Sequence, residues 1–144
     1  MARVLGIDLG SRRIGIAATD GLGLTAQPRE TLARHGGARD IEAIAAVVRD
    51  VDADRIVLGL PLDPGGGEGP AARRARDFGD KLAAALHLPV ELIDESFSTV
   101  EAEAVLLAAD VSRKRRKQVI DKLAAAVILQ RWLDQQRGVA EETT

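Results

Sequence analysis

The stretch GIDLGSRRIGIA, residues 6–17, places an acidic side chain within what otherwise reads as a buried strand. Apolar residues flank Asp8 on both sides, and Gly10 breaks the chain before an apolar run resumes at Ile14. An ionised carboxylate in such a setting costs free energy unless it is paired, hydrogen-bonded or bound to a metal ion. Asp8 is therefore a candidate functional residue, and the alternative is a structural acid held by the amides of the following turn.

The pattern of apolar residues around this stretch predicts the rest of the fold. Apolar runs predict strands over residues 3–9, 14–19, 24–32, 56–60 and 90–93. Helical spacing predicts helices over residues 39–51, 71–86 and 98–109, and a last helix that follows the basic stretch over residues 112–117 and ends near residue 135. This order indicates an α/β fold with a mixed central sheet, in which three antiparallel strands are followed by alternating helices and strands and flanked by helices.

Length and composition indicate one folded domain. A chain of 144 residues can bury a sizeable core, so we expect a single domain over residues 1–137 and a disordered tail over 138–144. No apolar run approaches a membrane span and the N-terminus has no signal-peptide layout, which predicts a cytoplasmic protein that does not act at a membrane. The absence of cysteine excludes disulfides, thiolate catalysis and cysteine zinc sites.

Acidic residues from distant parts of the chain recur beside apolar segments. Asp94 and Glu95 follow the predicted strand over 90–93, and Asp121 lies on an otherwise apolar face of the last helix. Together with Asp8 they are candidate ligands for Mg²⁺ or Mn²⁺, which prefer carboxylate oxygens. A pair of such ions activates water for phosphodiester hydrolysis. Taken singly, Asp94 and Glu95 could simply begin a loop and Asp121 could cap a helix, whereas Asp8 is the hardest to explain as a structural acid.

Basic residues supply candidate contacts to nucleic acid. The net charge is −2, so affinity for phosphates requires a local basic patch. The run SRKRRK, Ser112–Lys117, is such a patch, although runs of this kind are as often solvated surface. With two Phe, one Trp and no Tyr, a base-stacking platform is not expected. The predicted contacts are Arg12, Arg13, Arg73, Arg113, Lys114, Arg115, Arg116 and Lys117.

Four segments together resemble the YqgF/RuvX family, the pre-16S rRNA nucleases that are also described as Holliday-junction-resolvase-like proteins. In order along the chain, the matching segments are GIDLGSRRIGIA, IVLGLPL, DESFSTVEA and IDKLAAAVIL. The resemblance covers roughly residues 4–133, and four motifs in order are far more specific than one.

The resemblance implies an RNase H-like fold and metal-dependent hydrolysis of phosphodiester bonds. Asp8, Glu95 and Asp121 match the catalytic acids of the family, and Asp94 matches a neighbouring acid that assists in metal binding. The implied cofactor is Mg²⁺ or Mn²⁺, and the implied substrate is the precursor of 16S rRNA, processed during ribosome biogenesis. The resemblance leaves the oligomeric state, monomer or dimer, open.

One position departs from the family pattern. The family usually has Arg after the Asp-Glu pair, whereas Ser96 follows Glu95 here, which puts the positioning of the substrate in doubt. Two alternative functions keep the same fold: a Holliday-junction-type DNA resolvase, and a non-catalytic nucleic-acid-binding module. A nucleotide-binding protein like the actin-like ATPases is disfavoured, because 144 residues leave no room for the second domain that closes over the nucleotide.

Overall fold

The sheet joins an antiparallel meander to two parallel strands. The computed structural model describes residues 3–96 and 98–143, with side chains as far as residue 138. The strands are β1 (Arg3–Leu9), β2 (Arg13–Thr19), β3 (Ala26–Ala33), β4 (Ala53–Leu60) and β5 (Val90–Asp94). Their order is β3-β2-β1-β4-β5, with β1 antiparallel to β2 and parallel to β4. The predicted mixed sheet is confirmed. β3 lies at an edge of the sheet, where its Pro28 is tolerated because an edge strand has one side without ladder hydrogen bonds.

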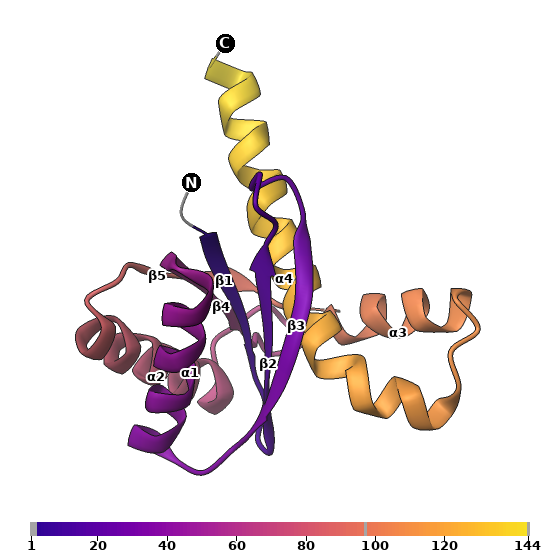
Figure 1. Cartoon of the computed structure of the whole chain (residues 1–144), viewed down its shortest axis with the longest axis horizontal. Helices are drawn as coiled ribbons and strands as arrows, with labels where there is room; N and C mark the ends of the chain where they lie inside the picture. The colour runs from indigo at the N-terminus through magenta and orange to yellow at the C-terminus, as the bar shows by residue number, and fades with distance from the viewer. Residues whose placement is uncertain (1–2, 97, 144) are drawn as a thin grey trace.

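Helices cover both faces of this sheet. They are α1 (Gly37–Val51), α2 (Pro70–Leu86), α3 (Ser98–Ala108) and α4 (Arg113–Thr143). α1 and α2 pack on one face and α4 on the other, as Figure 1 shows. Because side chains alternate along a strand, Ile7 and Leu58 enter the core beneath α1 and α2, whereas Ala17 and Val57 enter the core beneath α4.

Glycines in the strands admit α4 to the surface of the sheet. A Cβ atom at Gly6 would lie 2.7 Å from Cβ of Leu129, and one at Gly15 would lie 2.0 Å from the main-chain oxygen of Asp121. Neither distance leaves room for a side chain, so the close approach of the helix requires glycine at both positions. Gly15 is the partner of Asp8 in the ladder between β1 and β2. The first half of α4 is thereby held beside the end of β1.

The last helix is longer than the sequence predicts at both ends. It begins at Arg113, so the basic run is part of the helix rather than a segment leading into it. Ser112 starts the helix, since its hydroxyl accepts the Arg115 N–H at 3.3 Å and its carbonyl accepts the Arg116 N–H at 2.9 Å. The sequence predicts a disordered tail after residue 137, but the helical backbone continues to Thr143. No proline interrupts the helix over this stretch. Residue 144 lies outside the described residues.

Two segments lie outside the layered body of the fold. α3 and residues 113–120 of α4 form an arm that projects to the right in Figure 1. The loop over residues 61–69 contains a turn in which Gly66 donates to the Asp63 carbonyl and Asp63 donates to the Gly67 carbonyl, each at 2.8 Å. Within the described residues, no helix combines the length and the apolar character needed to cross a membrane.

Candidate active site

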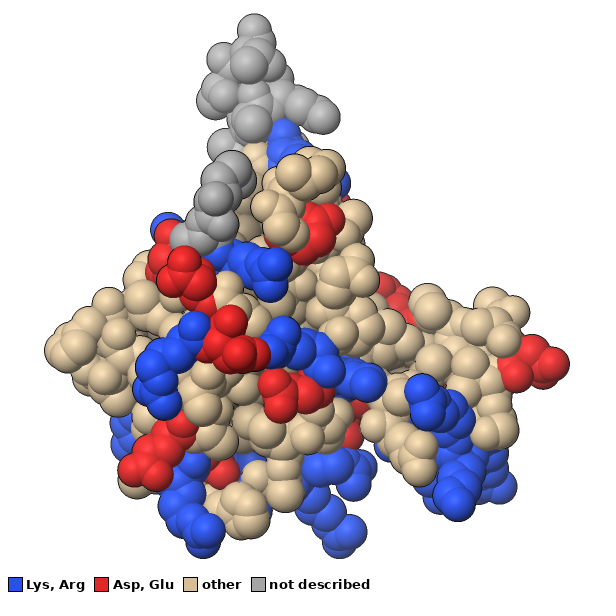
Figure 2. All heavy atoms as spheres, in the orientation of Figure 1, with Lys and Arg blue, Asp and Glu red and all other residues tan. Residues whose placement is uncertain are grey.

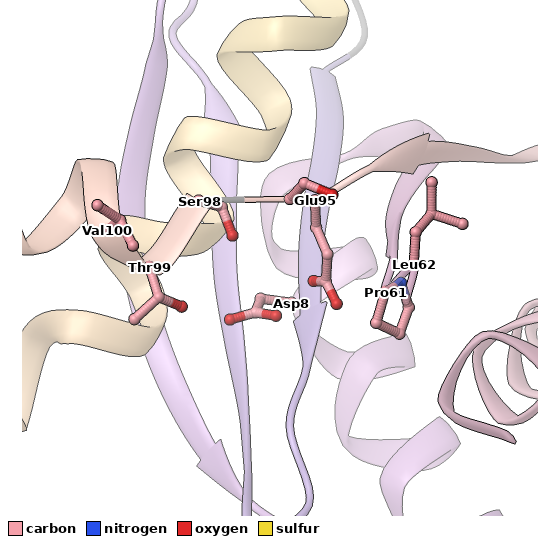
Figure 3. A pocket seen from close by; sticks show the side chains of 8 residues that line it. Asp8, Pro61, Leu62, Glu95, Ser98, Thr99 and Val100 are labelled. Atoms are coloured by element: carbon pink, nitrogen blue, oxygen red, sulfur yellow. The ribbon is translucent and has the colours of Figure 1, made fainter. Parts of the chain in front are cut away.

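Asp8 and Glu95 come from two strand ends and face the same cavity. Asp8 lies near the end of the central strand β1, and Glu95 directly follows β5. A Cβ atom at Gly59 of β4 would lie 2.6 Å from Glu95 Oε2, so the missing side chain leaves space for this carboxyl group between the two strands. The cavity has a volume of about 290 Å³ and also touches Pro61 and the start of α3. Figure 3 shows the two carboxyl groups close together within it.

The environment of Glu95 favours the protonated form. Among the described residues, no N–H or O–H group donates to its buried Oε2 atom. Burial, followed by the hydrogen bond and the charge of Asp8, raises the pKa of Glu95 to about 8. Burial also raises the pKa of Asp8, with a further contribution from the charge of Asp121, while the hydrogen bond with Glu95 opposes the rise. Without a cation, the two carboxyl groups therefore share a proton at neutral pH.

Asp121 lies near this pair but is bound to a cation of the chain itself. Its Oδ2 atom lies 2.6 Å from Nε of Arg13, and its side chain is 23% exposed. The ion pair joins α4 to β2 across 108 positions in the sequence. Across residues 3–96 and 98–143, no three acidic or histidine side chains come close enough together to hold a metal ion. The expected convergence is thus seen for Asp8 and Glu95, while Asp121 is turned to Arg13.

Asp94 is directed away from the cavity. Its side chain accepts the Ser96 N–H at 2.8 Å, and the hydrogen bonds of Ser96 lower its pKa. Its main-chain oxygen accepts a hydrogen bond from Arg131 of α4 at 3.1 Å. The charge of Arg131 also acts to lower the pKa of Glu95. Arg131 thus places a cation beside the acidic pair, near the position where the family pattern has an arginine and this chain has Ser96.

Asp8 and Glu95 have the chemistry of a divalent-cation site. Both supply hard oxygen ligands, and no group in the described part of the chain donates to the buried Oε2 atom of Glu95. A cation between the two groups would replace the shared proton and remove the repulsion between their charges. The residues therefore fit Mg²⁺ or Mn²⁺, with two carboxylates in place and Asp121 nearby as a third.

The start of α3 supplies cavity residues that the sequence analysis missed. Ser98 and Thr99 line the cavity, and Ser98 is only 3% exposed. In the sequence, the pattern of Ser98 and Glu101 indicates a capping box and so assigns Ser98 to helix initiation. The position of Ser98 could have identified it as a site residue, because it is three residues after Glu95. A chain that leaves a strand end beside a candidate site places its next residues near that site.

The predicted nucleic-acid contacts lie on several surfaces. Arg12 is exposed in the turn after β1, while Arg73 is exposed on α2 and lies outside the lining of the cavities found. On the arm, Arg116 is half-buried and lies 3.4 Å from Glu103, and its four basic neighbours are exposed: Arg113, Lys114, Arg115 and Lys117. Figure 2 shows Lys and Arg gathered along the lower side of the molecule, below the sheet and on the arm. Phosphate contacts by Arg13 would compete with its bond to Asp121.

Comparisons with known proteins agree with the sequence resemblance. The family model described as "RuvX: Holliday junction resolvase" matches residues 2–135. A relative from Myxococcus xanthus is 51% identical over 135 residues, which cover 94% of this chain and 89% of the relative. A relative from Halothermothrix orenii is 48% identical over 134 residues, which cover 93% and 96% of the two chains. Both relatives are named "Putative pre-16S rRNA nuclease".

Solved structures of DNA resolvases share the fold. The structure described as T. thermophilus RuvC in complex with Holliday junction substrate matches with a TM-score of 0.57 at 14% identity, over 96% of this chain and 97% of that chain. The fowlpox virus resolvase in complex with Holliday junction DNA matches with a TM-score of 0.58 at 10% identity, over 93% and 98%. At these identities the likeness concerns the fold alone, and the expected RNase H-like fold is confirmed.

Proposed function

The chain belongs to the RuvX family of nucleases, and we propose that it cleaves phosphodiester bonds in the precursor of 16S rRNA, in the cytoplasm and with Mg²⁺ or Mn²⁺. The rRNA substrate is the one in the names of the relatives that are about half identical to this chain. The metal requirement is supported by the site itself.

One observation carries this proposal: two half-buried carboxyl groups face each other, and among the described residues no N–H or O–H group donates to the buried Oε2 atom of Glu95. The chain places Gly59 where any side chain would displace Glu95, and so preserves the pair. Burying two acids together raises both pKa values and destabilises their ionised forms. Such a cost persists at functional sites, where the charge is needed for binding or catalysis.

We assign Asp8 and Glu95 as the residues that hold the metal ion. The bound ion would supply an activated water and stabilise the leaving oxygen in hydrolysis. Glu95 must release its proton before both carboxylates can bind a cation, so binding is expected to strengthen as the pH rises toward 8. Asp121 joins as a third acid when Arg13 exchanges its carboxylate partner for a phosphate of the substrate. Asp94 orders the loop through Ser96 and adds negative charge beside Glu95.

The basic residues are proposed to bind the sugar-phosphate backbone. The arm carries exposed cations, and the start of its helix α3 lines the cavity itself. Contacts to phosphates give affinity without base recognition, in keeping with the low aromatic content. The same surface would accept a four-way DNA junction, and the description of the matching family model favours that substrate as the second candidate.

A cleavage assay tests the proposal directly. The protein is incubated with precursor 16S rRNA and, separately, with a four-way DNA junction, each with Mg²⁺, with Mn²⁺ and with chelator. We expect cleavage of the RNA that depends on the metal and is lost in Asp8→Asn. Cleavage of the junction alone would support the resolvase instead. Metal-independent binding without cleavage of either substrate would indicate a non-catalytic nucleic-acid-binding module.

A further inference from the structure

A second and larger cavity adjoins the acidic pair on the side opposite the arm. Its volume is about 500 Å³, and it lies between the turn after β1, the start of α1 and the exposed face of α2. It shares Glu95 and Pro61 with the smaller cavity that contains Asp8. The two cavities therefore adjoin, with Glu95 in the lining of both.

The α2 side of this cavity presents two available cations. Arg74 and Lys81 both line it and are seven residues apart, which places them on one face of the helix, two turns from each other. Both are exposed, and neither forms an ion pair with any residue in the described part of the chain. On the same helix, Arg76 faces away from the cavity and is bound by Glu68 at 2.5 Å. Asp77 is the acidic residue that lines the cavity on α2.

Between these cations and the acidic pair, the cavity has an apolar floor. Phe78, 7% exposed, lies on α2 between Arg74 and Lys81, and Leu9 of β1 faces it from the sheet. The guanidinium carbon of Arg34 lies 6.0 Å from the centre of the Phe78 ring. The charge of Arg34 is already neutralised by Asp40 at 2.9 Å, so Arg34 completes the floor rather than adding a free cation. An apolar floor bounded by cations matches a nucleoside attached to a phosphate.

We propose that this cavity binds the nucleotide adjacent to the scissile phosphate, with Arg74 and Lys81 contacting its phosphate group. The inference rests on the proposed nuclease function and specifies the path of the substrate. The strand enters over the arm, crosses Asp8 and Glu95, and continues into the cavity against α2. Because Arg74 and Lys81 act beyond the reacting bond, they position the substrate and take no part in the chemistry.

The test compares single variants that each remove one positive charge. Arg74→Gln and Lys81→Gln are made in the Asp8→Asn protein, which prevents cleavage. Arg49→Gln is the matched control, because Arg49 is exposed in the last turn of α1, whereas this cavity meets α1 at Gly37 in its first turn. The probe is a labelled RNA that contains a mature end of 16S rRNA and its precursor flank, and the parent protein is first used to map the bond it cleaves. Binding is measured by fluorescence anisotropy at several salt concentrations.

We expect Arg74→Gln and Lys81→Gln each to weaken binding about threefold to tenfold and to reduce the salt slope by about 0.7, the value for one phosphate contact on a single strand. Arg49→Gln should match the parent. The probe is then made with a neutral methylphosphonate at the phosphate next to the cleaved bond, on either side in turn. On one side this change should weaken binding to the Asp8→Asn protein and have much less effect on the Arg74→Gln protein.

The outcomes separate this inference from the proposed function. If the parent cleaves the RNA but the α2 variants bind like the Arg49→Gln control, the subsite is wrong and the nuclease function stands. Equal sensitivity of all three variants to the methylphosphonate on both sides would also overturn the subsite, since it would indicate diffuse attraction. A parent protein that neither binds nor cleaves RNA or a DNA junction would overturn both proposals.

Discussion

The fold holds two carboxyl groups in opposite ways: Asp40, which is buried, and Glu95, which is half-buried with its Oε2 atom enclosed. Asp40 is 1% exposed and accepts hydrogen bonds from the backbone N–H groups of His35 and Gly36, at 2.8 and 3.1 Å, and from Arg34 at 2.9 Å. Burial alone would raise its pKa, but these bonds lower the pKa below its usual range. The buried Oε2 of Glu95 has no donor among the described residues, and the pKa of Glu95 is raised to about 8.

The donor groups and cations around each carboxyl group distinguish a structural acid from a candidate functional one. Asp40 satisfies its charge within the fold, and it holds Arg34 where that side chain donates to the Gly10 carbonyl at 2.6 Å, two residues after Asp8. Its role is to fix the end of β1. Within the described residues, the Oε2 atom of Glu95 lacks such donors, and the charge of Arg131 only partly offsets the cost of ionising the group. Desolvation disfavours the ionised form of both groups, and the partners decide the role.

The largest expected effect is the loss of cleavage when the acidic pair is broken. Asp8→Asn and Glu95→Gln should each lower the cleavage rate by about 10³-fold or more, since removing even one group directed at the reacting atoms costs about 10²–10³ in rate. In chelator, both variants should unfold at the same temperature as the parent or higher, because each replaces an acid whose ionised form is destabilised by burial. Added Mn²⁺ should stabilise the parent and stabilise the variants less. Thermal melts with and without metal, beside a cleavage assay, check both parts.

A large loss of stability in chelator for either variant would instead make the acidic pair structural, like Asp40.

Among the proposed substitutions, the one at Asp40 should lower the free energy of unfolding most. Asp40→Asn leaves the half-buried Arg34 without its partner, so it should cost roughly 2–4 kcal/mol of unfolding free energy, near the value for a broken buried pair. Urea unfolding should show the same loss with chelator and with Mn²⁺, since Asp40 is not expected to contact the metal. Dependence of the loss on metal would contradict the assignment.

Glu95 should make the free energy of unfolding fall as the pH rises. Because the folded pKa of Glu95 is raised from 4.5 to about 8, the folded state binds more protons than the unfolded state between these values. In chelator, the stabilisation from Glu95 is present below pH 4.5 and is lost as the pH rises toward 8. Glu95→Gln should flatten this fall in unfolding free energy, measured by urea unfolding from pH 5 to 8. An unchanged slope would assign the pH dependence to other groups.

The smallest effect should come from the ion pair between Arg13 and Asp121. Arg13→Ala frees Asp121 to join the acidic pair and should strengthen Mn²⁺ binding by up to about fivefold, since an ion pair this exposed is worth about 0.2–1 kcal/mol. Calorimetric titration of the nucleic-acid-free protein measures the change. Weaker binding in Arg13→Ala would mean that Arg13 holds Asp121 ready for the metal rather than away from it.

The order and type of the elements were predictable from local pattern. Apolar alternation identified the strands, helical spacing identified the helices, and Gly10 identified the tight turn after β1. The extension of α4 was missed at both ends. A basic run and a polar tail carry little periodicity, although neither contains a proline that would end a helix.

The acids of the site were identifiable because an acidic residue within or directly after an apolar run is conspicuous, and four family motifs reinforced them. What each acid contacts was decided by the tertiary structure alone. Asp121 meets Arg13 because glycine at position 15 lets α4 approach β2, and Arg74 rather than Arg73 enters a cavity because of how α2 lies on the sheet. Periodicity is a local property, whereas these contacts join residues distant in sequence through the packing of helices on the sheet. The sequence therefore determined which residues are candidates for the chemistry, and the fold determined which of them meet.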